Sequence, residues 1–417
     1  MIAEIIAIGS EMLTPYRQDT NSLYVTAGLN DLGVEVACKT IMGDNRAQMV
    51  AAVRIAVGRA DIVVLSGGLG PTEDDLTREC VAEALGLELY RDPTTMTALY
   101  KRFAERKTPM PTNNEKQAEV IDGAVLLENS NGSAPGQYLD TTVDGHRKIL
   151  VLLPGPPTEL KAMFDAAVKP RLKATLPARY LARRQLRMAL IPESTVDART
   201  APIYKQFTDV ATTILAGHGE IQLHFASAAA TRVVAESRVD AVAALVEEEM
   251  GEEIYSSNGE SLEEIVLLMM EMQGQKLAVA ESCTGGLLSQ RLTSIVNASR
   301  SFHGGAVVYS NEQKVNLCGV PAEMIEEHGA VSEEVARALA EGIRERCHCS
   351  LGLSITGIAG PAVTEGPDAG KAVGLVYIGL ADGEDTQVKQ LNLRGDRDRV
   401  RLWASEYALE MLRQRLM

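Results

Sequence analysis

Short apolar runs alternate with longer stretches of helical periodicity through residues 1–176 of the chain. The apolar runs predict strands over residues 2–8, 34–40, 61–66, 124–128 and 148–153. The stretches between them predict helices over residues 21–32, 46–58, 74–85, 94–104 and 158–172. Regular alternation of this kind is typical of an α/β domain whose helices cover both faces of a largely parallel sheet. We therefore predict a doubly wound α/β fold for this part.

The length of 417 residues predicts two or three domains, because a domain usually spans about 100–200 residues. We place the boundaries at 1–176, 177–258 and 259–417. The expected elements of the middle segment are strands over 186–191, 221–225 and 231–234 and helices over 195–207 and 239–250. This small α+β module has no Gly-x-x-Gly clamp for nucleic acid, and its acidic run Glu247-Glu248-Glu249 would repel phosphates. We interpret it as a structural spacer.

A glycine-rich loop, SGGLGPT at residues 66–72, follows the third predicted strand and precedes Glu73, Asp74 and Asp75. Ligands of doubly wound sheets bind where strand ends meet loops. Three glycines and a proline between a buried strand and a helix suit a phosphate cradle. The carboxylates suit a hard divalent ion, but carboxylates in a first helical turn also stabilise the helix dipole. The loop alone leaves metal binding and helix capping equally open.

A second loop of small residues lies in the run AVAESCTGGLLSQ, residues 278–290. The run predicts a short apolar strand over 277–280, a tight turn and a helix. The turn carries Ser282, Cys283, Thr284, Gly285 and Gly286. Such a turn exposes backbone N–H groups at a helix N-terminus, where an anion is favoured. An ordinary helix cap would explain the same residues equally well.

Downstream, the run NASRSFHGGAVVYSNEQK covers residues 297–314. Residues 306–310 predict a strand, and the following helix carries Lys314 in its first turn. Ser299 precedes this strand, so a reversal of chain direction would bring Ser299 and Lys314 together. A serine hydroxyl needs a base, and a lysine can serve when burial or a positive helix end lowers its pKa. The sequence suggests a Ser/Lys hydrolase, against the alternative of a solvated helix lysine.

Five runs resemble, in order, the motifs of the C-terminal domain of the CinA family: ESCTGG, VVYSNEQK, HGAVS, ITGIAGP and GDRDRVR. That domain is similar to nicotinamide mononucleotide (NMN) deamidases, which implies hydrolysis of NMN to nicotinate mononucleotide and ammonia without a cofactor. On this resemblance Ser299 is the nucleophile, Lys314 its base and Tyr309 an assisting hydroxyl. The implied substrate contacts are Ser282, Thr284, Gly285, Gly286, Thr356, Gly357 and Arg397. The family loop often reads Gly-Ser-Ser, where this sequence has Ala298-Ser299-Arg300.

The N-terminal runs resemble the other large domain of the same family, which is related to the molybdopterin-binding fold. In some members this domain is a metal-dependent ADP-ribose pyrophosphatase, which implies ADP-ribose as a ligand and a divalent metal ion as a cofactor. The implied ligand-binding residues are Asp19, Asn21, Gly67, Gly68, Gly70, Thr72 and Asp74, with Asp75 and Glu11 at the metal. Ser10 stands where the family usually has Asp, and this weakens the implied metal site. The middle module resembles the small KH-type domain of the family.

Charge and composition narrow the classes of partner. A formal net charge of −15 argues against nucleic-acid binding, which depends on basic surface. No apolar run approaches the roughly 20 residues of a membrane span, and the N-terminal MIAEIIAIGSE lacks the basic segment of an export signal. Six cysteines without a CxxC pair fit free thiols in a reducing compartment. We expect a cytoplasmic protein with no membrane or nucleic-acid partner.

The last predicted helix covers residues 396–416. Its apolar residues share one face and predict a core or homodimer contact: Val400, Trp403, Ala404, Tyr407, Met411 and Leu412. Two functions of different class follow. One is an amidohydrolase, with or without a pyrophosphatase in the same chain. The other is a non-catalytic nucleotide-binding adaptor or sensor linked to competence. The presence of Ser299, Tyr309 and Lys314 favours the enzyme.

Overall fold

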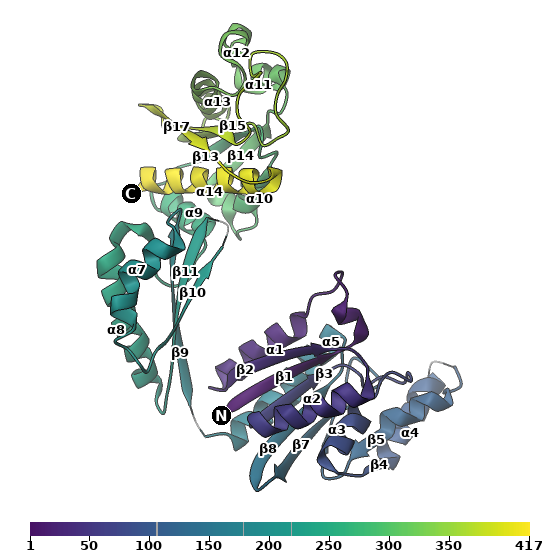
Figure 1. Cartoon of the computed structure of the whole chain (residues 1–417). Helices are drawn as coiled ribbons and strands as arrows, with labels where there is room; N and C mark the ends of the chain where they lie inside the picture. Colours follow the sequence, from purple (N-terminus) through teal and green to yellow (C-terminus); the bar gives the residue numbers. More distant parts are fainter. Residues whose placement is uncertain (106, 178, 218) are drawn as a thin grey trace. The chain divides into compact units, whose positions relative to one another are not determined.

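The structure is a computed structural model that describes residues 1–105, 107–177, 179–217 and 219–417. The chain forms two compact units, residues 1–181 with 228–235, and residues 182–227 with 236–417 (Figure 1). The boundaries of the three expected domains stay a prediction. In the described residues, no helix is long and apolar enough to cross a membrane, and all six cysteines are free thiols.

The first unit is built on a six-stranded sheet in the order β2-β1-β3-β8-β7-β6. Four strands are parallel: β1 (Ile2–Ile8), β2 (Glu35–Met42), β3 (Ile62–Ser66) and β8 (His146–Leu153). At one side β7 (Gly136–Val143) pairs antiparallel with β8, and β6 (Val125–Leu127) pairs antiparallel with β7. All five residues of β3 are buried, because helices cover both faces. The sequence predicted the parallel strands and missed β7, whose outer half, residues 140–143, is mostly polar.

Helices pack on each face of this sheet. The first layer holds α1 (Thr20–Asp31), α5 (Pro157–Met163), the π-helix Phe164–Val168 and α6 (Lys169–Thr175). The second layer holds α2 (Arg46–Arg59) and α3 (Thr77–Leu85). This arrangement confirms the doubly wound prediction. Helix α4 (Pro93–Glu105) and the short ribbon of β4 (Leu89–Arg91) and β5 (Glu119–Ile121) complete the unit. Asp74 and Asp75 precede α3 rather than starting it.

The middle of the chain forms a four-stranded sheet in the order β10-β11-β9-β12. Its elements are β9 (Tyr180–Ala189), α7 (Glu193–Tyr204), β10 (Ala211–Ala216), β11 (Glu220–Ala229), α8 (Arg232–Met250) and β12 (Ile254–Ser256). The expected strand over 231–234 is wrong, because α8 begins there. The Thr231 hydroxyl accepts the N–H of Val234, and Val233 is 75% exposed, so this β-branched run is the solvent-facing first turn of a helix.

The C-terminal sheet has five strands in the order β14-β13-β15-β16-β17. They are β13 (Leu277–Glu281), β14 (Phe302–Val307), β15 (Leu351–Gly357), β16 (Leu375–Ala381) and β17 (Thr386–Asn392). One face carries α9 (Leu262–Met272), α10 (Leu287–Thr293) and α14 (Arg397–Leu416), and the other carries α11 (Asn311–Cys318), α12 (Ala322–His328) and α13 (Glu333–Arg346). The strand expected over 306–310 begins four residues earlier.

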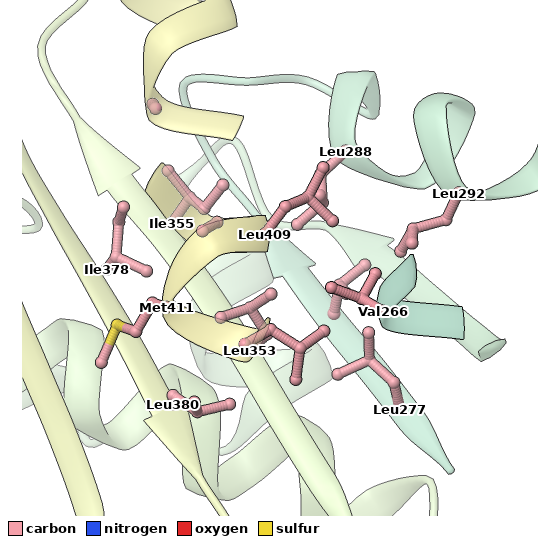
Figure 2. Close-up of a cluster of buried hydrophobic side chains, with 14 of the residues drawn as sticks. Val266, Leu277, Leu288, Leu292, Leu353, Ile355, Ile378, Leu380, Leu409 and Met411 are labelled. Carbon is pink, nitrogen blue, oxygen red and sulfur yellow. The ribbon is translucent and has the colours of Figure 1, made fainter. Parts of the chain in front are cut away.

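Leucine, isoleucine and valine side chains from α9, α10 and α14 interlock with the sheet (Figure 2). Leu353 and Ile355 of β15 lie at the centre of this core beneath Leu409 of α14. The apolar face predicted for α14 is largely confirmed, since Val400, Ala404, Met411 and Leu412 are buried. The same helix also buries Glu406 and Arg413, at 3% and 6% exposure, although neither belongs to that apolar face.

Candidate functional site

The C-terminal ends of three parallel strands meet in the C-terminal sheet. β13 pairs in parallel with β14 on one side and β15 on the other, with Glu281 opposite Val307 and Ile355. The residues that follow these strand ends, Ser282 and Thr356 among them, therefore lie side by side. Ligands of α/β sheets bind at such strand ends. This edge is the candidate site of the second unit.

Glu281, the last residue of β13, closes the N-terminus of α10 with its own side chain. The carboxylate accepts the N–H groups of Gly286, Leu288 and Ser289 at 2.8–3.0 Å and the Ser289 hydroxyl at 2.7 Å. We expected this helix N-terminus to receive a ligand anion, but a protein carboxylate, 1% exposed, already lies there. Sequence reasoning missed Glu281, although it opens the ESCTGG run.

Two backbone amides of the turn stay available for a ligand. Gly285 and Gly286 have left-handed φ values of 60° and 93°, which suit glycine, and this reverses the chain into α10. Within the described part of the chain, the N–H groups of Cys283 and Thr284 have no acceptor, whereas those of Ser282 and Gly285 are hydrogen-bonded. The Thr284 hydroxyl is also buried without a partner among these residues. The turn thus offers donors of the kind that stabilise an oxyanion.

Lys314 projects into this site from the first turn of α11, and its side chain is 2% exposed. Its ammonium donates to the Ser282 hydroxyl at 3.3 Å and to the carbonyl groups of Val308 and Tyr309 at 3.0 and 3.4 Å. Burial lowers the pKa of Lys314, and the nearby Asp368 carboxylate opposes this effect. A buried amine beside a serine hydroxyl is an arrangement that activates a serine.

Cys283 is not a competing nucleophile. It adjoins Ser282, but burial raises the pKa of its thiol to about 11. The thiolate is the reactive form of cysteine, so this side chain is inert at neutral pH.

Ser299, the expected nucleophile, lies at the opposite end of β14 from Lys314. It is exposed in the 3-10 turn Ala298–Arg300 before the strand begins, whereas Lys314 contacts Val308 just beyond the end of the strand. The six residues of β14 span about 20 Å at 3.3 Å per residue, too far for proton exchange. The predicted Ser299–Lys314 pair is therefore wrong. Parallel pairing brings Lys314 to the end of β13, where Ser282 lies.

Helix α14 contributes two guanidinium groups near the turn. Arg397 donates to the Tyr309 hydroxyl at 3.1 Å and to the Gly360 carbonyl, and Tyr309 is 61% exposed. Arg401, one turn further along, donates to the Thr284 carbonyl at 2.9 and 3.3 Å. Arg401 thereby fixes the turn from outside. Sequence reasoning included Arg397 and Tyr309 and missed Arg401, which lies in the same GDRDRVR run.

Thr356 and Gly357, at the end of β15, have structural roles. The buried Thr356 hydroxyl donates to the Ala330 carbonyl at 2.7 Å. A Cβ at Gly357 would lie 2.7 Å from the Val376 side chain and 2.9 Å from the Leu375 carbonyl oxygen. The adjacent strand β16 therefore requires glycine here. Both residues border the turn, but neither offers a free side chain to a substrate.

The loop between β15 and β16 is fastened beside the site by Asp368 and Lys371. The Asp368 carboxylate accepts the N–H groups of Ala330 and Val331 at 2.9 and 3.1 Å. The Lys371 ammonium donates to two carbonyl groups of the same turn at 2.7 and 2.8 Å and to Asp368 at 2.8 Å. Sequence reasoning missed both residues, because an Asp and a Lys in a polar loop carry no motif signal.

The first unit contains a separate cavity of about 310 Å³, where loops follow β1, β3 and β8. The expected residues that line it are Glu11, Gly67, Gly68, Gly70, Asp74 and Asp75. Asp44 and Glu159 join them and were missed. Five carboxylates thus face this cavity, and its described lining includes no Lys or Arg. A bare phosphate entering it would meet strong electrostatic repulsion.

Three consecutive carbonyl groups of the glycine-rich loop are held by the start of α3. The Thr77 hydroxyl donates to Gly67 at 2.8 Å, the Thr77 N–H to Gly68 at 3.2 Å, and the Arg78 guanidinium to Leu69 at 2.7 Å. In a trans peptide the N–H points opposite to the carbonyl, so the following amides face the other way. Successive N–H groups presented in this manner form an anion-binding concavity. Arg78 is fully buried, and burial lowers its pKa to about 10.

The two residues expected at a divalent metal ion, Asp75 and Glu11, contact their own loops. One Asp75 oxygen accepts both the N–H and the hydroxyl of Thr72, and the Glu11 carboxylate lies against Gly9. Across the residues described, no group of three or more His, Cys, Asp or Glu side chains is placed to hold a metal ion. Asp75 therefore acts as a loop cap in this arrangement, and a divalent metal ion at Asp75 and Glu11 stays a prediction.

Asp19 and Asn21 hold the start of α1 in place. Asp19 accepts the N–H of Ser22 at 2.9 Å as the N-cap. The Asn21 amide donates to the Gly155 carbonyl at 2.7 Å and the Ser66 hydroxyl at 3.2 Å. Asn21 thus ties the helix to two loops that border the cavity, which is a supporting role rather than a ligand contact.

Comparisons with known proteins agree with this architecture. Two family models match the chain, the CinA C-terminal domain over residues 259–416 and the probable molybdopterin binding domain over residues 4–174. A match to the crystal structure of competence/damage inducible protein CihA from Agrobacterium tumefaciens has 33% sequence identity and a TM-score of 0.35. This match covers 36% of the present chain and 91% of the CihA chain. CinA-like proteins of Acidobacterium capsulatum and Koribacter versatilis are 58% and 54% identical, and each match covers 100% of both chains. With relatives this similar along its whole length, the chain belongs to the CinA family.

Proposed function

We propose that the C-terminal part of the chain hydrolyses the carboxamide of NMN to nicotinate mononucleotide and ammonia, with Ser282 as the nucleophile and Lys314 as its base. The observation that carries this proposal is the 3.3 Å approach of the Lys314 amine to the Ser282 hydroxyl. The choice of NMN rests on membership of the CinA family and on the resemblance of its C-terminal domain to NMN deamidases.

The chemistry requires one proton to move back and forth. Neutral Lys314 takes the proton of the Ser282 hydroxyl as its oxygen attacks the carboxamide carbon. The Lys314 ammonium then gives this proton to the amide nitrogen. The C–N bond breaks, ammonia leaves, and the acyl group stays on Ser282 as an ester. Water attacks the ester while Lys314 accepts a proton from it. Collapse of that intermediate returns the proton to Ser282 and releases the nicotinate nucleotide.

The surrounding groups fit the two charges of such a substrate. The amides of Cys283 and Thr284 are available to the oxygen that becomes negative, and losing one such donor typically costs about 100- to 1,000-fold in rate. Arg397, beside the exposed Tyr309, suits the nucleotide phosphate, since a guanidinium binds phosphate through paired hydrogen bonds. Burial of Lys314 supports its role as a base, because burial favours the neutral amine.

The test is ammonia release by the purified full chain from NMN, with nicotinamide riboside as the comparison. We expect release from NMN, and much slower release from the riboside, which lacks the phosphate. Release from NMN no faster than in the Ser282→Ala variant would refute the proposal. A non-catalytic adaptor or sensor linked to competence would then be the better description of this part.

A second candidate function concerns the cavity of the first unit, which we propose binds ADP-ribose. The anchored carbonyl groups of Gly67, Gly68 and Leu69 support a phosphate site there. The experiment is formation of AMP and ribose phosphate from ADP-ribose with several added divalent metal ions, and its loss in Asp75→Ala. Binding without turnover for every metal would leave this unit as a binding module.

A further inference from the structure

A buried carboxylate lies on α14, the helix that also holds the Ser282 turn through Arg401. Glu406 of α14 is 3% exposed, and one of its oxygens binds the Arg291 guanidinium of α10 at 2.6 Å. The other oxygen is buried and has no hydrogen-bond partner among the described residues. Natural proteins rarely leave a buried carboxylate half satisfied, so this residue needs an explanation.

Arg291 joins the two helices that flank the Ser282 turn. It lies in the last turn of α10, the helix that starts directly after the turn. Its guanidinium also binds Glu263 of α9 at 2.5 Å and the Ser405 hydroxyl of α14 at 2.7 Å. The N-terminal turns of α14 meanwhile hold the Thr284 carbonyl through Arg401. The Glu406–Arg291 pair therefore fixes how α10 and α14 sit around the Ser282 turn.

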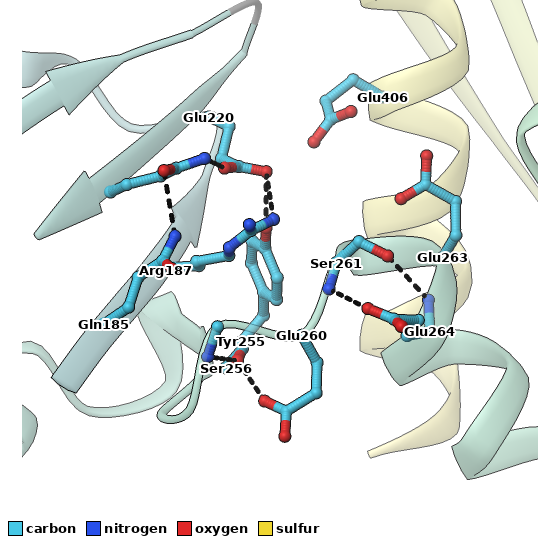
Figure 3. Close-up of polar contacts among 12 residues, drawn as sticks. Gln185, Arg187, Glu220, Tyr255, Ser256, Glu260, Ser261, Glu263, Glu264 and Glu406 are labelled. Carbon is cyan, nitrogen blue, oxygen red and sulfur yellow. Dashed lines mark hydrogen bonds and ion pairs between the residues drawn. The ribbon is translucent and has the colours of Figure 1, made fainter. Parts of the chain in front are cut away.

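The charges that face Glu406 come from three other elements. They are Arg291 on α10, Glu263 on α9 and Glu220 on β11. Figure 3 shows Glu220 and Glu263 on either side of Glu406. Arg187 of β9 and Tyr255 of β12 are engaged by Glu220 instead, at 3.5 and 2.6 Å. Arg291 is thus shared between Glu263 and Glu406, with Glu220 adding repulsion. The repulsion among the three carboxylates favours a proton on Glu406.

We propose that Glu406 is a positioning residue for the Ser282 turn, and that gain of a proton by Glu406 loosens the contact between α10 and α14 and lowers the activity of the site. The effect on activity rests on the proposed amidohydrolase function, whereas the effect on the turn does not.

The expected titration lies in the neutral range. Burial raises the pKa of Glu406 to about 7, although the Arg291 guanidinium opposes the rise. Above that pH the carboxylate pairs with Arg291. Below it the acid is neutral, and Arg291 keeps only Glu263 and Ser405. Because burial makes the folded chain hold this proton more tightly than the unfolded chain, global stability falls as pH rises from the ordinary glutamate range to about 7. The contact with Arg291 opposes that effect, because it favours the carboxylate, so this contact is strongest above that pH.

The test compares wild type, Glu406→Gln and Glu345→Gln, an exposed carboxylate of α13 that serves as the matched control. Hydrogen exchange of residues 282–293 is measured at pH 6 and pH 8 and corrected for the intrinsic rates. We expect wild type and Glu345→Gln to be better protected at pH 8, and Glu406→Gln to show the same low protection at both. A pH dependence that persists in Glu406→Gln, or is absent in wild type, would overturn the proposal.

Activity gives the second readout. Glu406→Gln should lower kcat for NMN at pH 8 by about tenfold with little change in KM, and it should remove the inflection near neutral pH. The increase of activity with pH that comes from deprotonation of Lys314 should remain in this variant. If wild type releases no ammonia from NMN, the proposed function fails, and the exchange measurement still decides the role of Glu406.

Discussion

The Lys314 amine lies 3.3 Å from the Ser282 hydroxyl, although 32 positions separate the two residues in the sequence. The contact depends on two parallel strands that end together, β13 before Ser282 and β14 before the helix of Lys314. The proposed role of Lys314 as a base also depends on burial of its amine, because an exposed lysine would stay protonated at neutral pH. Strand register and burial therefore bring together the proposed nucleophile and its proposed base.

The first prediction separates the two serines. Ser282→Ala should lower ammonia release from NMN by at least about 1,000-fold, because it removes the attacking oxygen. Ser299→Ala should leave the rate within about twofold of wild type, since exposed substitutions far from the site have small effects. The measurement is an ammonia assay on both purified variants at equal concentration. Loss of activity in Ser299→Ala with retention in Ser282→Ala would reverse our assignment.

The second prediction concerns the proton on Lys314. Activity should rise with pH as the lysine loses its proton, and the midpoint should lie below the usual lysine range, because burial lowers this pKa. Lys314→Arg keeps a positive charge but cannot act as a base, so it should be inactive over the same range. The measurement is kcat/KM for NMN from pH 6 to pH 10. Substantial activity in Lys314→Arg would exclude Lys314 as the base.

The third prediction concerns the stability supplied by Glu281. Glu281→Ala leaves three buried or part-buried amides and one hydroxyl without this acceptor, so it should reduce the free energy of unfolding by about 3 kcal/mol. Ser289→Ala removes only the hydroxyl bond and should cost about 1 kcal/mol. Urea unfolding of the full chain measures both. Equal stability of the two variants would show that the carboxylate does not organise the turn.

The fourth prediction compares two glycines of similar backbone conformation in the first unit. Gly68 and Gly86 have φ values of 66° and 68°. A Cβ at Gly68 would lie 2.2 Å from the Thr77 hydroxyl, whereas a Cβ at Gly86 would have no heavy atom within 4 Å. Both alanine variants should suffer backbone strain of about 1 kcal/mol, but only Gly68→Ala should displace the loop.

Calorimetric titration with ADP-ribose and a divalent metal ion checks this comparison. We expect binding to be lost in Gly68→Ala and kept in Gly86→Ala. Binding that is unchanged in Gly68→Ala would place the ligand elsewhere in the unit.

Much of the architecture follows from local sequence. Apolar runs of strand length between helical stretches predict β1, β3 and β8 and the helices on both faces, because burial on two sides demands continuous apolar strands. The glycines of the two tight turns are equally readable, since positive φ values select glycine. Misjudged segments, such as the expected strand over 231–234, are short and β-branched, where propensity is weak and packing decides.

The sequence by itself determined the α/β fold and the positions of both glycine-rich turns, and it singled out Lys314 as a candidate base. Only the tertiary structure decided that Ser282 rather than Ser299 meets this lysine, that Glu281 fills the helix N-terminus, and that Glu406 is buried. The physical reason is the same in each case. Distance along the chain does not specify which strand ends adjoin, and a residue's burial depends on elements that may be more than a hundred positions away.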